Sequence, residues 1–270
     1  MSALFDLTGR VAVVTGGGLG IGRAIALGFA EHCANVVVCD INDEALAEIG
    51  ALLTELGSDG GAIHADIADA ADIRRLFAFV DELLGHVDIL VNNVGIGARF
   101  HPEDLPLADF ERVMRTGVTG SLLCSQEAGR RMIARGAGGS IINTSSIAGA
   151  TAIGRGNLAH SVNKSAVNML TKELAVEWAQ HRIRVNAILP CQVLTEGFQT
   201  WLDSPAFDPA LMDTFLKGIP MNRLATAADM VGPAVFLASD ASAMVTGTLL
   251  GVDGGNLAFN AGGSHTWLTA

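Results

Sequence analysis

Residues 11–22 read VAVVTGGGLGIG, an apolar, β-branched run that leads directly into a cluster of glycines. The run predicts a buried strand over Val11–Thr15, and the glycines from Gly16 to Gly22 predict a tight turn. Helical spacing of apolar residues starts at Gly20, so the turn opens a helix. Such a turn lets the chain approach a pyrophosphate closely at the helix N-terminus, although an ordinary tight turn would use the same residues.

Beyond this stretch, short β-branched runs alternate with longer segments of helical spacing. The predicted strands are Val11–Thr15, Asn35–Cys39, Gly61–Ala65, Asp88–Asn92, Ser140–Thr144, Arg184–Leu189 and Thr248–Val252. The predicted helices include Gly20–His32, Asp43–Leu56, Asp69–Leu84 and Leu158–Gln180. Strict alternation indicates parallel βαβ units, and strands that are apolar throughout indicate a sheet covered on both faces. We therefore predict an α/β fold, a Rossmann-type doubly wound parallel seven-stranded sheet with helices on both faces, as a single domain over residues 1–270.

Composition narrows the classes of function. The chain has 270 residues, half of them hydrophobic, with 28 acidic against 17 basic residues and a formal net charge of −11. An acidic chain repels a phosphate backbone, so nucleic acid is not an expected partner. No apolar run approaches the roughly 20 residues of a membrane helix, and a strand is already expected at Val11, so we predict a cytoplasmic location without membrane contact. The four cysteines lack metal spacing, so no metal is expected.

Polar residues follow the next predicted strands, at the edge where ligands of such sheets bind. Asp40 comes about 20 residues after the glycine turn, where a carboxylate would bind the adenosine ribose hydroxyls and repel a 2′-phosphate. Asp40 therefore favours NAD over NADP, although it could instead cap the helix that starts near Asp43. Asp66-Ile67 and the run Asn92–Gly95 end the third and fourth strands, and they too could be simple caps.

Together these features resemble the short-chain dehydrogenase/reductase family. Thr15–Gly22 matches its TGxxxGxG loop, Asp66-Ile67 its Asp-hydrophobic pair near adenine, and Asn92–Gly95 its NNxG strand end. Ile141–Ser146 is similar to the strand that bears the catalytic serine. Further matches are Arg184–Pro190, before the nicotinamide loop, and Val245–Gly255, the last strand. The resemblance covers essentially the whole chain.

The resemblance implies a cofactor site and a catalytic site. The implied NAD-binding residues are Gly16, Leu19, Gly20, Ile21, Gly22, Asp40, Asp66, Ile67, Asn93, Gly95, Lys164, Pro190, Val193 and Thr195. The family's catalytic groups are an asparagine, a serine and a Tyr-x-x-x-Lys pair. Ser146 and Lys164 match, but His160 stands at the tyrosine position, and the chain contains no tyrosine. Gly117 stands at the asparagine position, and Cys191 where the family usually has glycine.

His160 is a candidate base. A free imidazole has a pKa of about 6.5 against about 10 for a phenol, and Lys164 one helical turn away would lower it further. A neutral imidazole suits removal of a proton from an alcohol, although its reach is shorter than that of a phenol by roughly 2 Å. We therefore predict an NAD-dependent oxidoreductase that transfers hydride between nicotinamide and a secondary alcohol or ketone at a Ser146-His160-Lys164 site.

Two alternatives stay open. The chain could keep bound NAD and perform non-redox chemistry, or none, as a pseudoenzyme or subunit partner. A nucleophilic Cys191 thiolate paired with His160 would need a lowered thiol pKa and hydrogen-bond reach, neither of which the sequence indicates.

By resemblance, residues of about 191–220 form a substrate lid, and about 257–270 form a C-terminal tail. Large apolar side chains favour an apolar small-molecule substrate, although packing would give the same pattern: Leu194, Phe198, Trp201, Leu202, Phe207, Leu211, Met212 and Phe215. Family members are commonly dimers or tetramers, and the apolar bulk of Leu158–Trp178 agrees with a homo-oligomer, either a tetramer or a dimer.

Overall fold

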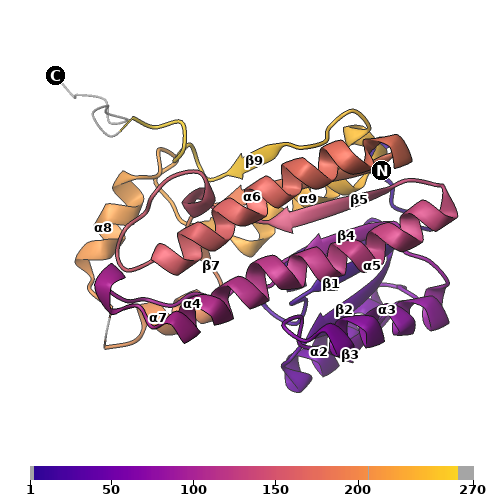
Figure 1. Cartoon of the computed structure of the whole chain (residues 1–270), viewed down its shortest axis with the longest axis horizontal. Helices are drawn as coiled ribbons and strands as arrows, with labels where there is room; N and C mark the ends of the chain where they lie inside the picture. The colour runs from indigo at the N-terminus through magenta and orange to yellow at the C-terminus, as the bar shows by residue number, and fades with distance from the viewer. Residues whose placement is uncertain (1–2, 206, 261–270) are drawn as a thin grey trace.

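A computed structural model describes residues 3–205 and 207–260 and contains one parallel sheet of seven strands (Figure 1). In sheet order these are β3 Gly61–His64, β2 Asn35–Asp40, β1 Val11–Thr15, β4 Ile89–Asn92, β5 Gly139–Thr144, β6 Ile183–Pro190 and β9 Leu249–Val252. Each strand lies within one residue of its predicted bounds, so the predicted doubly wound sheet is confirmed. The strand order reverses between β1 and β4, which is where such sheets bind ligands.

Helices cover both faces of the sheet, as predicted. One face carries α1 Gly20–Glu31, α2 Asp43–Glu55 and α9 Val231–Ala238, and the other carries α3 Ala70–Leu84, α5 Gly120–Arg135 and α6 Leu158–Trp178. Strand β1 shows why two cores form, because alternate side chains point to opposite faces. Ala12 and Val14 join the first core, and Val11 and Val13 join the second. In Figure 1, α5 and α6 cross the second face.

The helix bounds follow local signals. Helix α3 begins where the Asp69 side chain accepts a hydrogen bond from the Ala71 amide at 2.6 Å, and it ends at Gly85, which adopts φ +77°. Shorter helical segments complete the chain: η1 Ala3–Phe5, η2 Pro102–Asp104, η4 Ile147–Gly149, η5 Ala179–His181, η6 Ala227–Met230 and η7 Asp240–Ser242.

One helix is interrupted by a widened turn. Helix α4, Leu107–Met114, continues into a π-helical turn, η3, over Arg115–Thr119, and then into α5. A π turn bends a helix and often marks a functional site. Gly117 lies inside this turn.

The predicted lid, residues 191–220, carries helices of its own. It contains the short strand β7, Val193–Leu194, and the helices α7, Glu196–Leu202, and α8, Ala210–Lys217, which Figure 1 shows at one end of the molecule. Strand β7 pairs with β8, Ala225–Thr226, in a small parallel sheet that the sequence did not predict. Of the predicted tail, 257–270, only residues up to 260 lie within the described part of the chain. Among the described helices, none has the length and apolar character needed to cross a bilayer.

Candidate functional site

The glycine loop folds tightly back on itself. A Cβ atom on Gly22 would lie 2.0 Å from the Gly16 carbonyl oxygen, so only glycine fits there. Gly16 itself adopts φ +62°, in the left-handed region. The Asn93 side chain donates a hydrogen bond to the Gly16 carbonyl at 3.1 Å, which ties the loop to the end of β4. The loop therefore brings backbone groups close to whatever lies above β1 and β4.

The N-terminus of α1 already binds an anionic group. The Gly20 amide donates a hydrogen bond to the Glu196 carboxylate at 3.0 Å, and the N-cap residue Leu19 provides no side-chain cap. Free amides and the helix dipole favour negative charge at this position. The Glu196 carboxylate thus occupies the place of an anionic ligand, and the N-terminus of α1 fits a pyrophosphate. Glu196 was not among the predicted site residues, although it directly follows Thr195 of the predicted cofactor set.

Asp40 is not a helix cap. One of its carboxylate oxygens accepts a hydrogen bond from the Gly18 amide at 3.1 Å, and the other from Ile41 at 2.8 Å. The cap of α2 is the Asn42 side chain, which accepts from the Ala45 amide at 3.1 Å. The capping alternative for Asp40 is therefore wrong, and its carboxylate lies beside the glycine loop, where it fits an adenosine ribose.

The Asp66-Ile67 pair follows β3 at the same edge. Asp66 accepts a hydrogen bond from the Ala68 amide at 2.8 Å, and its own amide donates to Asp72. Ile67 is buried against α5, where a Cβ on Gly120 would lie 2.7 Å from its carbonyl oxygen.

One cleft of about 600 Å³ unites the catalytic candidates with much of the cofactor set. Nine of the predicted residues line it: Ile21, Asn93, Gly95, Ser146, His160, Lys164, Pro190, Val193 and Thr195. The other predicted residues are not part of its lining: Gly16, Leu19, Gly20, Gly22, Asp40, Asp66 and Ile67. These belong to the glycine loop after β1 and to the ends of β2 and β3, the two strands on that side of the sheet.

Lys164 lines the cleft from helix α6. Its side chain is buried, and its ammonium group donates a hydrogen bond to the Thr144 carbonyl at 2.7 Å. A Cβ on Gly95 would lie 3.0 Å from Nζ, so the glycine at the end of β4 makes room for it. Burial lowers the pKa of Lys164 to about 8.

His160 lies one helical turn before Lys164 and is half-buried. Burial, followed by the charges of Lys164 and Arg99, lowers its pKa to about 4, and a backbone hydrogen bond with Ile96 partly opposes this. The repulsion by Lys164 was predicted from the sequence, but burial, which is the larger cause, was not. The imidazole is therefore neutral near pH 7 and able to accept a proton.

Ser146 faces the same cleft as His160. Its hydroxyl oxygen accepts a hydrogen bond from the Ala148 amide at 3.1 Å. The neighbouring Ser145 is buried and donates to Asn168 at 2.6 Å, which joins the end of β5 to α6. The loop that carries Ser146 and helix α6, which carries His160, are thus held together.

An amide from α6 fills the space beside Gly117. A Cβ on Gly117 would lie 2.2 Å from the Asn163 amide nitrogen. Asn163 is buried and donates a hydrogen bond to the Val113 carbonyl at 2.7 Å, just before the π turn. The Gly117 carbonyl accepts from the Ser121 hydroxyl at 2.6 Å. The missing asparagine at residue 117 was noted from the sequence, but Asn163 was not predicted as a site residue. Its signal was an asparagine directly before Lys164.

Cys191 also lines the cleft, but its environment does not favour a thiolate. Burial is the main cause that raises its pKa, and the charge of Asp253 adds to it. The nucleophilic-thiol alternative therefore lacks the lowered pKa that it needs.

Within residues 3–205 and 207–260, no group of three or more His, Cys, Asp or Glu side chains is arranged to hold a metal.

Known proteins are similar to this chain in both sequence and fold. A family model described as enoyl-(acyl carrier protein) reductase matches residues 17–256. D-threitol dehydrogenase from Mycolicibacterium smegmatis is 39% identical over 254 residues, covering 93% of this chain and 94% of the relative. NAD-dependent glycerol dehydrogenase from Listeria innocua is 36% identical over 252 residues, covering 93% and 95%. Gluconate 5-dehydrogenase from Burkholderia cenocepacia, solved with NADP and tartrate, superimposes with a TM-score of 0.89 at 34% identity, covering 96% of this chain and 99% of that one.

Proposed function

Because the chain belongs to the short-chain dehydrogenase/reductase family of oxidoreductases, we propose that it is an NAD-dependent dehydrogenase that oxidises a secondary alcohol with His160 as general base. The observation that carries this proposal is a neutral imidazole in one cleft with Ser146 and Lys164. The relatives named for threitol, glycerol and gluconate support an alcohol substrate.

Each polar group has a part in the reaction. A bound NAD would supply the nicotinamide ring as the hydride acceptor. His160 accepts the hydroxyl proton, directly or through one water, and Ser146 donates a hydrogen bond that orients the substrate oxygen. Lys164 would hold the cofactor ribose from its buried position. Because the pKa of His160 is about 4, the ring is neutral at pH 7: it is available as the proton acceptor of alcohol oxidation and rarely carries the proton that ketone reduction requires.

The Asp40 carboxylate supports NAD as the cofactor. It lies beside the Gly18 amide, and no basic residue follows it at Ile41 or Asn42. A 2′-phosphate at this place would meet like charge without a compensating cation.

Asn163 serves as a positioning residue. Its amide bonds the Val113 carbonyl beside the π turn, from the position directly before Lys164. It therefore fixes α6 against the α4–α5 helix and, through α6, the height of His160 and Lys164 in the cleft.

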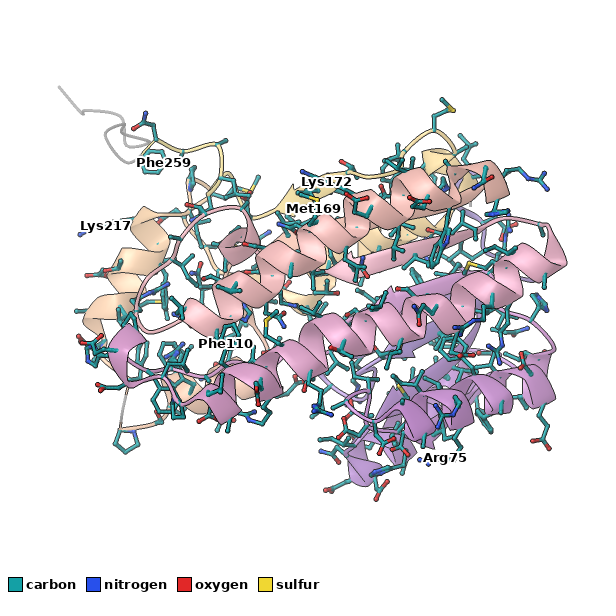
Figure 2. The ribbon with its side chains drawn as sticks, in the orientation of Figure 1. Arg75, Phe110, Met169, Lys172, Lys217 and Phe259 are labelled. Atoms are coloured by element: carbon teal, nitrogen blue, oxygen red, sulfur yellow. The ribbon has the colours of Figure 1, made fainter. Side chains whose placement is uncertain are left out.

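The outer side of α6 supports a homo-oligomer. It exposes a row of apolar side chains at helical spacing, Leu158, Val162, Met169 and Val176, of which Met169 is labelled in Figure 2. Val176 is 77% exposed, and burial against a second copy would remove this surface from water.

The test is to incubate the protein with NAD and a panel of polyols and hydroxy acids while following nicotinamide absorbance. We expect turnover of at least one secondary alcohol. The absence of tyrosine favours a second candidate, an NAD-binding protein without redox activity. NAD binding without turnover of any alcohol or ketone across the pH range would establish that candidate instead.

A further inference from the structure

Arg99 lines the catalytic cleft, and both Arg99 and Arg155 line a second space that overlaps it. Arg99 follows β4, Arg155 precedes α6, and both border a space of about 670 Å³ together with Ser146 and His160. The charge of Arg99 is felt by His160 and by Arg155, so the three side chains share one electrostatic environment. The reaction assigned to His160 gives neither arginine a part.

The backbone holds the two arginine loops together. The Phe100 amide, next to Arg99, donates a hydrogen bond to the Gly156 carbonyl, next to Arg155, at 3.2 Å. Gly154, Arg155 and Gly156 adopt φ values of +63°, +57° and +72°. Glycine accepts this left-handed conformation, but an arginine between two glycines adopts it at a cost that functional sites often carry. The loop is therefore shaped to direct Arg155.

Aromatic rings of the lid support both guanidinium groups. The Arg99 guanidinium carbon lies 4.1 Å from the centre of the Trp201 ring, and that of Arg155 lies 4.7 Å from the centre of the Phe215 ring. The two rings are themselves 6.3 Å apart. Stacking on a ring leaves the in-plane N–H donors of a guanidinium free for a ligand. Trp201 and Phe215, which suggested an apolar substrate from the sequence, thus pack on one another and stack against the two guanidinium groups.

No acidic side chain neutralises these cations within the described residues. Neither Arg99 nor Arg155 forms an ion pair there, and no Asp or Glu of residues 3–205 and 207–260 lines the space that they border. Elsewhere in this acidic chain arginines do find carboxylates, as Arg223 finds Asp229 at 2.7 Å. Burial and the charge of Arg99 also lower the pKa of Arg155, which a bound oxyanion would reverse.

We propose that the substrate is a hydroxy acid, a polyol chain whose one end is an oxyanion bound by Arg99 and Arg155 while a secondary hydroxyl faces His160. This assignment rests on the proposed function and names the substrate class of the same cleft. A carboxylate matches the planar, two-pronged donors of a guanidinium, and a phosphate offers the same chemistry with more charge. The tartrate bound to the related gluconate 5-dehydrogenase is an anion of this kind.

The experiment compares three substrates with one carbon skeleton: gluconate, D-glucitol 6-phosphate and neutral D-glucitol. We expect kcat/KM to be higher for one of the two acids than for D-glucitol, and the better acid identifies the oxyanion. Arg99→Gln and Arg155→Gln should each lower the ratio of acid to D-glucitol kcat/KM by about 10- to 100-fold, the size of a lost hydrogen bond between charged groups. Arg74→Gln, an exposed arginine on α3, is the matched control and should keep the ratio.

A binding measurement separates this proposal from the proposed function. Calorimetric titration of gluconate and of D-glucitol 6-phosphate into the protein with NADH needs no turnover. Binding of an acid that both arginine variants weaken and Arg74→Gln does not would support the oxyanion site even in an inactive protein. Oxidation of D-glucitol with equal or higher kcat/KM than both acids, and unchanged in the arginine variants, would overturn it while leaving the dehydrogenase in place.

Discussion

The side chain of Asn163 occupies the space that a side chain on Gly117 would need. A Cβ at residue 117 would lie 2.2 Å from the Asn163 amide nitrogen and 2.4 Å from its oxygen. The two positions belong to different helices, η3 and α6, which pack directly against each other here. An isolated substitution at either residue therefore disturbs a packed pair.

The pair predicts a strongly non-additive double-mutant cycle. Gly117→Asn alone forces two amides into one site, and Asn163→Ser alone leaves the buried Val113 carbonyl without its partner, at a cost of about 1–3 kcal/mol. The double variant puts one asparagine back at residue 117 and should recover much of the lost stability. Urea unfolding measures all three. Additive losses in the double variant would show that the two residues are independent.

We expect the Glu196 carboxylate to compete with a bound pyrophosphate for the N-terminus of α1. Its carboxylate accepts a hydrogen bond from the Gly20 amide, so a bound pyrophosphate has to displace it and its charge. Glu196→Gln removes the charge and should tighten NAD binding by a few fold, about 1 kcal/mol or less for a charge at an exposed helix terminus. Calorimetry with NAD measures the change, and Glu177→Gln, on α6 outside the cleft, serves as control. Weaker binding by Glu196→Gln would mean that Glu196 contributes to the cofactor site.

Asp40 predicts the choice between the two cofactors. The wild type should bind NADH more tightly than NADPH, and Asp40→Ala should narrow this preference by removing the repulsion of the 2′-phosphate. Asn42→Ala, which removes the cap of α2 without a change in charge, should leave the preference unchanged. Equal or tighter binding of NADPH by the wild type would contradict the assignment.

The apolar row on α6 predicts the state of association. Light scattering at micromolar concentration should report a dimer or tetramer, and Met169→Glu with Val176→Glu should shift it towards the monomer because charges cannot be buried unpaired. Leu56→Glu, at an exposed apolar residue beyond α2, is the control. A wild type that is already monomeric would reject the proposed interface.

Much of the fold was predictable because the buried strands are short and apolar throughout. The bounds of β1, Val11–Thr15, agree to the residue, and the glycine turn marks the start of α1. The strand pair β7–β8 was not predictable, because two-residue strands leave no periodic pattern.

The site was predictable where a motif fixed it and not where tertiary packing did. Ser146, His160 and Lys164 do line one cleft. The burial that lowers the pKa of His160 arises from tertiary packing, which no local pattern reveals. The same is true of Asn163 and of the two arginines, which meet their partners over separations of 50 residues or more, as between Asn163 and Val113.

The low pKa of His160 predicts the pH dependence of alcohol oxidation. The reaction needs the neutral imidazole, so the rate should hold as the pH falls from 7 to about 5 and be lost only as it falls through about 4. A reaction that depends on a phenolate as proton acceptor would already lose rate at a much higher pH, because the phenolate is protonated there. A rate that rises with pH only above the ordinary histidine range would exclude His160 as the base.

The most direct test is to replace His160 with alanine and measure alcohol oxidation and NAD affinity on the same preparation. If His160 is the base, kcat for oxidation should fall by about 10²- to 10⁴-fold, while the dissociation constant of NAD changes little because Lys164 remains. Ser161→Ala, at the next residue of the helix, controls for general damage to α6. Full oxidation by His160→Ala, with unchanged NAD binding, would show that the base lies elsewhere and would contradict the account.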